Sequence, residues 1–120
     1  MIELHDIVVK FGEFTALNNI NVHVKEGEFF TFLGPSGCGK TTTLRTITGF
    51  IRPESGIVSM RGRDITRVPI EERSIGIVFQ SYALFPSMTV RDNIAFGLKI
   101  KKLKRPEIER KVNALSLIHI

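Results

Sequence analysis

The 120-residue sequence predicts an α/β fold in which strands alternate with short helices. Residues 2–11 form an apolar, β-branched run, and residues 21–25 alternate with a period of two, as a strand with one solvent-exposed face does. Residues 29–33 are apolar at nearly every position, which is typical of a strand buried on both faces of a mostly parallel sheet. A glycine-rich loop and a helical pattern follow, so this part is predicted to be strand, loop and helix.

After the glycine-rich loop, the sequence continues to predict short helices and strands. Residues 41–50 are predicted to be helical because apolar residues fall three apart and Gly49 is placed to end the helix. Residues 57–63 predict a small hairpin. Residues 75–79 predict a second short buried strand.

Two further helices are predicted near the end of the chain. Thr89 and Asp92 have the spacing of a capping box, which starts a helix. Three apolar residues four apart then share one face: Val90, Ile94 and Leu98. Pro106, with acidic residues after it, opens the last helix.

Composition bounds the class of protein. Hydrophobic residues make up 42% and charged residues 24%, so the chain is ordinary globular material, long enough for one domain. The single cysteine, Cys38, excludes an internal disulfide and a cysteine-built metal site. The sequence has no apolar run long enough to span a membrane and no signal peptide, so we expect a soluble cytoplasmic chain.

The formal net charge of +5 comes entirely from residues 99–111, because residues 1–98 carry equal numbers of basic and acidic side chains. A basic segment can attract an acidic partner, such as nucleic acid or anionic lipid. It can also be a solvated helix face, which is the interpretation that we favour.

Residues 34–41 match the phosphate-loop pattern G-x-x-x-x-G-K-[ST], between a predicted buried strand and a helix. Glycines allow the backbone to approach closely, so amide N–H groups at the helix N-terminus can point at phosphate oxygens. Lys40 would reach the β- and γ-phosphates, and the Thr41 hydroxyl would bind Mg²⁺. The segment reads Gly34-Pro35-Ser36-Gly37-Cys38-Gly39-Lys40-Thr41.

Further segments carry a family resemblance over residues 2–113. With the phosphate loop, extended by Thr42, they are Arg52-Pro53-Glu54-Ser55-Gly56, Val78-Phe79-Gln80-Ser81-Tyr82-Ala83-Leu84-Phe85-Pro86, Thr89-Val90-Arg91-Asp92-Asn93-Ile94 and Phe96-Gly97-Leu98. The chain resembles the ATP-binding subunit of a bacterial ABC importer, in the branch that includes maltose, polyamine, ferric-iron and thiamine uptake ATPases. The resemblance implies a P-loop NTPase fold in residues 1–114: an antiparallel β subdomain plus part of a RecA-like core, incomplete.

The resemblance also implies a set of site residues. ATP would lie on residues 34–42, with Phe11 stacked on adenine and Mg²⁺ held by Thr41 and Gln80. Lys40 and Gln80 would be the catalytic residues. The alternatives are an edge or core phenylalanine at Phe11 and a hydrogen-bonded polar residue at a strand end for Gln80. Three residues would face a membrane permease, with core packing as their alternative: Tyr82, Leu84 and Phe85.

The function implied by the resemblance is ATP hydrolysis coupled to solute import. The implied partners are a second ATPase subunit in a homodimer, membrane permease subunits and a periplasmic or lipoprotein solute-binding protein. The implied location is peripheral, on the cytoplasmic face of the bacterial inner membrane. We expect no nucleic acid partner.

Three motifs of the family are missing from these 120 residues: the apolar strand ending in Asp-Glu, the LSGGQ-type signature and the histidine downstream of it. We therefore expect the segment to lack ATPase activity by itself. Residues 115–120, Leu-Ser-Leu-Ile-His-Ile, depart from the family pattern and resemble a translated transposase-end adaptor, so we predict that they are not native.

Two other functional classes remain open on the residues alone. A small-molecule kinase or GTPase shares the phosphate loop. A non-catalytic module could bind nucleic acid through residues 99–111. Guanine preference or transfer of phosphate to an acceptor would favour the first, and salt-dependent DNA binding the second.

Overall fold

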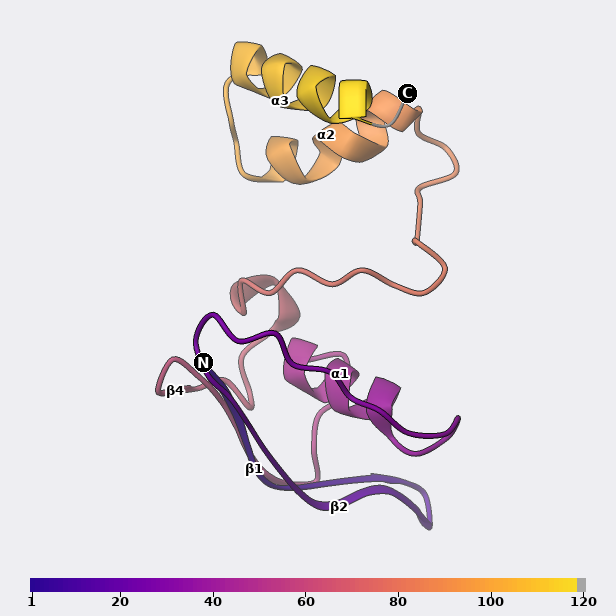
Figure 1. The fold of residues 1–120 in the computed structure, drawn as a ribbon, viewed down its shortest axis with the longest axis vertical. Coiled ribbons are helices and arrows are strands. Elements are labelled where there is room, and N and C mark those ends of the chain that lie inside the picture. The colour runs from indigo at the N-terminus through magenta and orange to yellow at the C-terminus, as the bar shows by residue number, and fades with distance from the viewer. Residues whose placement is uncertain (119–120) are drawn as a thin grey trace. The chain divides into compact units, whose positions relative to one another are not determined.

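The computed structural model describes the backbone of residues 1–118 and the side chains of residues 1–115. The chain divides into two units, residues 1–77 and residues 78–120, and each is described by itself (Figure 1).

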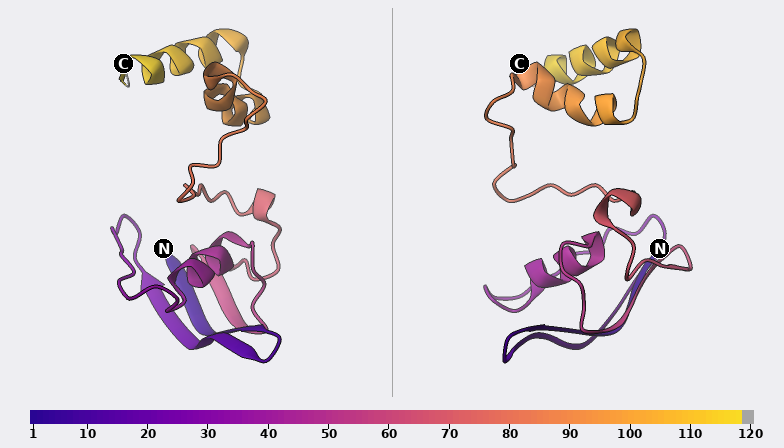
Figure 2. Two further views of the ribbon diagram at one scale, coloured as in Figure 1. Left: turned by 90° about the vertical axis from the view of Figure 1, so that its right-hand side faces the viewer. Right: turned by 180° about the vertical axis from the view of Figure 1, so that it is seen from behind.

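The first unit is built on a four-stranded antiparallel sheet with the order β2-β1-β3-β4. The bounds of its strands are β1 Ile2–Phe11, β2 Phe14–Val24, β3 Ser55–Met60 and β4 Arg63–Asp64. The predicted strand at 2–11 and the predicted hairpin at 57–63 are confirmed, and the strand predicted at 21–25 is the end of the longer β2, which stops at Val24. The long strands β1 and β2 lie side by side, with the shorter β3 and β4 beyond β1, and a helix covers one face of the curved sheet (Figure 2).

An interruption in β1 gives the sheet its bend. The register of β1 shifts between Leu4 and Ile7 against β2, and Asp6 adopts a positive φ of 49°. The Asn21 side chain accepts a hydrogen bond from the Asp6 amide at 3.0 Å and donates one to the Asp6 carboxylate at 3.0 Å. On the other side, a Cβ at Gly56 would lie 2.5 Å from the Asp6 carbonyl oxygen, so glycine is required there.

Helix α1, Lys40–Thr48, packs on this sheet. Ile47 enters the core, whereas Leu44 remains 47% exposed. Gly49 ends the helix in the left-handed conformation, φ 95°, and its amide donates to the Arg45 carbonyl at 3.0 Å, as predicted. The buried core joins residues from three strands, α1 and the segment after β4: Leu4, Ile7, Val9, Leu17, Ile47, Val58 and Ile65.

A buried arginine near the end of the first unit links two of its segments. The 3-10 helix η1, Ile70–Glu72, leads to Arg73, which is 3% exposed. Its guanidinium donates hydrogen bonds of 2.8–3.1 Å to four backbone carbonyls: Thr46, Ile47, Thr66 and Val68. Arg73 thereby joins the end of α1 to the segment that follows β4.

The two predicted buried strands, at 29–33 and 75–79, are wrong for this chain. Neither segment is a strand in the structure, and Phe29 is 94% exposed, Leu33 88% and Val78 84%. A buried strand needs hydrogen-bonded neighbours on its edges and packed layers on its faces. Within residues 1–118 the sheet consists of antiparallel strands alone, so neither run finds the parallel partners that its composition fits.

The second unit contains helices α2, Val90–Ile100, and α3, Arg105–Ile118, which contact one another. The predicted capping box is present, because the Thr89 hydroxyl oxygen accepts a hydrogen bond from the Asp92 amide at 3.1 Å. Pro106 lies in the first turn of α3, as predicted. An ion pair between Arg91 and Glu109 links the two helices.

Residues 115–118 continue α3, and residues 119–120 lie outside the described part. The expectation that residues 115–120 are not native stays a prediction. Among the described residues, no helix is both long and apolar enough to cross a membrane.

Candidate nucleotide-binding site

The glycine-rich loop, residues 34–39, leads directly into α1, whose N-cap is Gly39. Gly39 adopts φ 92°, a left-handed conformation that favours glycine. A Cβ there would also lie 2.8 Å from Leu17 Cδ2 and 3.3 Å from the Ala16 carbonyl oxygen. Two independent constraints, backbone conformation and close packing on β2, therefore select glycine at this position.

The start of α1 leaves backbone donors free. The first helical hydrogen bond runs from the Thr43 amide to the Gly39 carbonyl at 2.8 Å, so the amides of Lys40, Thr41 and Thr42 have no acceptor within the helix. Gly39 has no side chain with which to cap them. These amides, together with the positive end of the helix dipole, form an environment suited to an anion.

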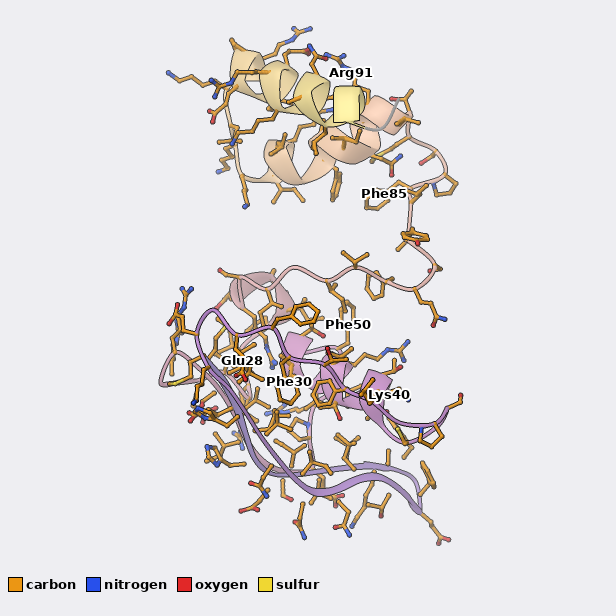
Figure 3. The ribbon with its side chains drawn as sticks, in the orientation of Figure 1. Glu28, Phe30, Lys40, Phe50, Phe85 and Arg91 are labelled. Carbon is orange, nitrogen blue, oxygen red and sulfur yellow. The ribbon has the colours of Figure 1, made fainter. Side chains whose placement is uncertain are left out.

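Lys40 is folded back over the loop. Its ammonium nitrogen donates to the Gly34 carbonyl at 2.6 Å and to the Pro35 carbonyl at 2.7 Å, and it lies 3.3 Å from Cys38 Sγ. The two carbonyl acceptors carry no formal charge, and no carboxylate of the described residues pairs with the ammonium, so its positive charge is not neutralised. The Lys40 ammonium therefore lies beside the glycine-rich loop, where one anion could contact both the ammonium and the loop amides (Figure 3).

The hydroxyls of α1 differ in what they contact. Those of Thr43, Thr46 and Thr48 are turned back onto carbonyls of the preceding turn at 2.8–3.0 Å. Thr41 is exposed at the first turn, and among residues 1–115, whose side chains the structure describes, its hydroxyl makes no hydrogen bond. Thr41 therefore differs from the structural threonines of the same helix in being available to a ligand.

The remaining loop residues are accessible. Gly34 is in a positive-φ conformation, and a Cβ there would lie 2.7 Å from Cys38 Sγ. Gly37, φ 83°, has no atom within 4 Å of a built Cβ. Pro35, Ser36 and Cys38 are exposed, and Cys38 is a free thiol.

Phe11 lies at the end of β1, directly opposite Phe14 across the hairpin turn, and it is 52% exposed. The core alternative for Phe11 is therefore wrong for this chain. Its adenine-stacking role stays a prediction.

Gln80 belongs to the second unit and is exposed. The strand predicted to precede it is absent, so the alternative of a buried strand-end residue does not hold for this chain. Gln80 and the phosphate loop belong to different units, and the metal-binding role of Gln80 stays a prediction. Nearby, Leu84 is 72% exposed and Tyr82 77%, whereas Phe85 packs against Phe96 with ring centroids 4.5 Å apart.

Sequence reasoning missed two residues. Arg73 carries no local signal, because a charged side chain is expected at the surface unless its acceptors are known. Phe14 has a signal, since it follows Phe11 across a two-residue turn and a hairpin places such residues opposite one another. Among residues 1–115, no group of three or more acidic, histidine or cysteine side chains is arranged to hold a metal ion.

The family model described as ABC transporter matches residues 17–120. The chain is 53% identical over 112 residues to the spermidine/putrescine import ATP-binding protein PotA of Nitrosomonas eutropha, covering 93% of this chain and 31% of that protein. It is 51% identical over 119 residues to the protein of the same name from Oleidesulfovibrio alaskensis, covering 98% of this chain and 32% of that one. The chain thus spans about a third of the length of these curated relatives.

Solved structures agree with this match. The ATP-binding cassette MJ0796, solved as a dimer in a post-hydrolysis state with ADP and Pi, aligns with a TM-score of 0.81 and 32% identity, over 97% of this chain and 56% of that chain. A second dimeric structure of the same cassette aligns with a TM-score of 0.80. The predicted fold, an N-terminal portion of an ATP-binding cassette with an antiparallel sheet, is confirmed. The chain belongs to the ABC transporter family.

Proposed function

We propose that residues 34–42 bind the phosphates of Mg·ATP, and that the chain is part of the ATP-binding subunit of an importer. The observation that carries the proposal is the start of α1, where free amides, the Lys40 ammonium and the unengaged Thr41 hydroxyl gather at one loop. Membership of the ABC transporter family supports the same ligand.

The residues present fit a magnesium-bound triphosphate. The donors are amides and an ammonium, which suit phosphate oxygens. The hydroxyl of Thr41 is a hard oxygen ligand of the kind that Mg²⁺ prefers. Gly37 leaves open space where a side chain would fill the loop. No carboxylate forms a hydrogen bond or ion pair with Lys40 in the described part of the chain, so none competes with phosphate for it.

Each residue would have a separate task. Lys40 would exchange its two carbonyl acceptors for phosphate oxygens, and the amides at the start of α1 would hold the β-phosphate. Thr41, with Gln80 from the second unit, would ligate the metal. The bound Mg²⁺ would neutralise negative charge on the phosphates during transfer to water. Because catalysis of this kind is positioning and charge stabilisation, loss of Lys40 should be costly.

The activity that we propose for the whole protein is argued from its relatives. They are import ATP-binding proteins, and the solved cassettes are dimers. We infer that the protein pairs with a second copy and with permease subunits at the cytoplasmic face of the membrane. We also infer that a solute-binding protein delivers the substrate and that the substrate is a polyamine, as the names of these relatives state for them.

Binding of Mg·ATP to the 120-residue chain, measured by calorimetry, tests the site. Lys40→Ala should weaken binding at least tenfold, because charge-assisted hydrogen bonds contribute about 1.5–3 kcal/mol. Lys101→Ala, at an exposed lysine of the second unit, is the matched control and should leave affinity unchanged. Equal affinities for the Lys40→Ala variant and the unmodified chain would refute the proposed site.

A chimera tests the transport role. Residues 1–114 would replace the corresponding segment of the Nitrosomonas eutropha protein in cells that depend on it for spermidine uptake. We expect uptake to be retained, and to be lost with Lys40→Ala in the same chimera. A chimera that binds ATP but imports no spermidine would reject the polyamine role and leave nucleotide binding standing.

A further inference from the structure

The second unit carries the whole net charge of the chain, and each of its acidic side chains is already paired. Residues 78–120 contain eight basic and three acidic residues, whereas residues 1–77 contain nine of each. The three acidic residues form the ion pairs Asp92–Lys99, Glu107–Lys111 and Glu109–Arg91. Within residues 78–115, whose side chains the structure describes, the other five cations therefore have no carboxylate partner.

Four of these five cations gather in the turn that joins α2 to α3 (Figure 1). The turn spans residues 101–105, which we call the basic turn, and its exposed cations are Lys101, Lys102, Lys104 and Arg105. From the first to the last of these residues the chain can extend over at most about 14 Å. This length is comparable with the Debye length of about 10 Å at 0.1 M salt, so the four charges act on a partner as one patch.

The backbone of the basic turn has a defined conformation. The Lys102 amide donates to the Lys99 carbonyl at 2.9 Å, and the Leu103 amide donates to the Leu98 carbonyl at 3.3 Å. These two hydrogen bonds form a Schellman motif, in which Lys102 takes the left-handed position with φ 54°. Glycine fits that position at lower conformational cost than lysine, so the fold of the turn does not account for a lysine there.

An exposed isoleucine adjoins the basic turn. Ile100 is the last residue of α2, and it is 65% exposed. An apolar side chain beside several cations suits the boundary between lipid headgroups and acyl chains, where both kinds of group find partners. Residues 99–111 contain no aromatic side chain on which a nucleic acid base could stack. The composition of this surface therefore fits a lipid surface better than a single-stranded nucleic acid.

We propose that the basic turn, together with Ile100, binds directly to the anionic headgroups of a phospholipid membrane. A negatively charged membrane surface attracts basic residues next to it, with a gain in affinity of about fivefold for each lysine or arginine. The proposed function brings the chain to the membrane through permease subunits. The contact inferred here is made by the chain with lipid and needs neither permease nor nucleotide, so it goes beyond that function and each can fail without the other.

The experiment is flotation of the 120-residue chain with vesicles made of equal parts of phosphatidylcholine and phosphatidylglycerol. Vesicles of phosphatidylcholine alone have no net surface charge and should bind the chain weakly. Lys102→Gly combined with Lys104→Gln should lower the affinity for the anionic vesicles about thirtyfold, since two charges are removed. Because glycine suits the left-handed position, this variant should keep its helices, which circular dichroism checks.

A matched control removes the same charge from another place. Lys25→Gln combined with Arg67→Gln neutralises two exposed cations of the first unit and should leave vesicle affinity unchanged. Ile100→Ser keeps every charge and should weaken binding to anionic vesicles without changing binding to duplex DNA. Higher salt should weaken the interaction of the unmodified chain with the vesicles, because mobile ions screen exposed charges.

The outcomes decide between lipid and its alternatives. Loss of vesicle binding in the Lys102→Gly, Lys104→Gln variant alone, with a further effect of Ile100→Ser, supports the inference. Equal losses in this variant and in the Lys25→Gln, Arg67→Gln control would show an effect of net charge and overturn it. Absence of binding to anionic vesicles, or tighter binding to duplex DNA that Ile100→Ser leaves unchanged, also overturns it. Binding of Mg·ATP is measured separately and is unaffected by any of these results.

Discussion

Replacing Arg73 by methionine removes a buried guanidinium while keeping much of the apolar length of the side chain. Arg73 is 3% exposed and donates to four backbone carbonyls. Two of them, Thr46 and Ile47, lie in the last turn of α1, where carbonyls lack helical partners. Arg73 thus satisfies the end of the same helix whose start forms the phosphate loop.

The magnitude follows from the two fully buried hydrogen bonds. The carbonyls of Thr46 and Ile47 would lose their donor away from water, whereas those of Thr66 and Val68 are only partly buried. An unsatisfied buried polar group costs about 1–3 kcal/mol, so Arg73→Met should lower the free energy of unfolding by about 2–6 kcal/mol. Burial lowers the pKa of Arg73, which reflects the desolvation of its charge that these hydrogen bonds must offset.

The assay is urea unfolding of the 120-residue chain, followed by circular dichroism. Arg67→Met, at an exposed arginine, is the control, because surface substitutions usually change stability by less than about 0.5 kcal/mol. A domain is stable by only about 5–15 kcal/mol, so the expected loss is easily measured. If Arg73→Met unfolded within about 0.5 kcal/mol of the unmodified chain, the account of these hydrogen bonds would be refuted.

Two other predictions concern charge and capping. A hydrogen bond from Ser59, and then one with His23, lowers the pKa of Glu3 below its ordinary value near 4.5. Its stabilising contribution is therefore present above that value and lost as pH falls through the lower folded-state pKa, and Glu3→Gln should flatten the decrease of the urea midpoint below about pH 5; an unchanged slope would contradict this. Thr89→Ala should destabilise α2 by about 1 kcal/mol and speed exchange of the Asp92 amide hydrogen, and unchanged exchange would argue against the cap.

Local signals predicted well wherever a residue and its partner are close in sequence. The cap at Thr89 and the end of α1 at Gly49 each depend on atoms within four residues, so the pattern contains the whole interaction. The phosphate loop is similar, because its amides and Lys40 belong to one short segment. The hairpin at 57–63 also depends on neighbouring residues alone.

Prediction from the sequence failed for residues whose structure depends on contacts with a second, distant segment of the chain. Residues 29–33 and 75–79 have the composition of buried strands, but composition does not provide the strands that would pair with them. Arg73 is the opposite case: its charge predicts exposure, and only the fold brings four carbonyls from two segments around it. Partner identity is the information missing from both predictions.

The sequence by itself determined the family motifs, the helix boundaries and the chemistry of the phosphate loop, because each of these is a short-range property of consecutive residues. The tertiary structure decided which face of the hairpin carries Phe11 and Phe14, since the register shift between Val9 and Lys10 and the burial of Val9 in the core that includes Ile47 set that face. It also decided how α1 is held at both ends, by β2 at Gly39 and by Arg73 at its last turn. The physical reason is that packing and non-local hydrogen bonds depend on segments far apart in the chain, whose approach no local pattern encodes.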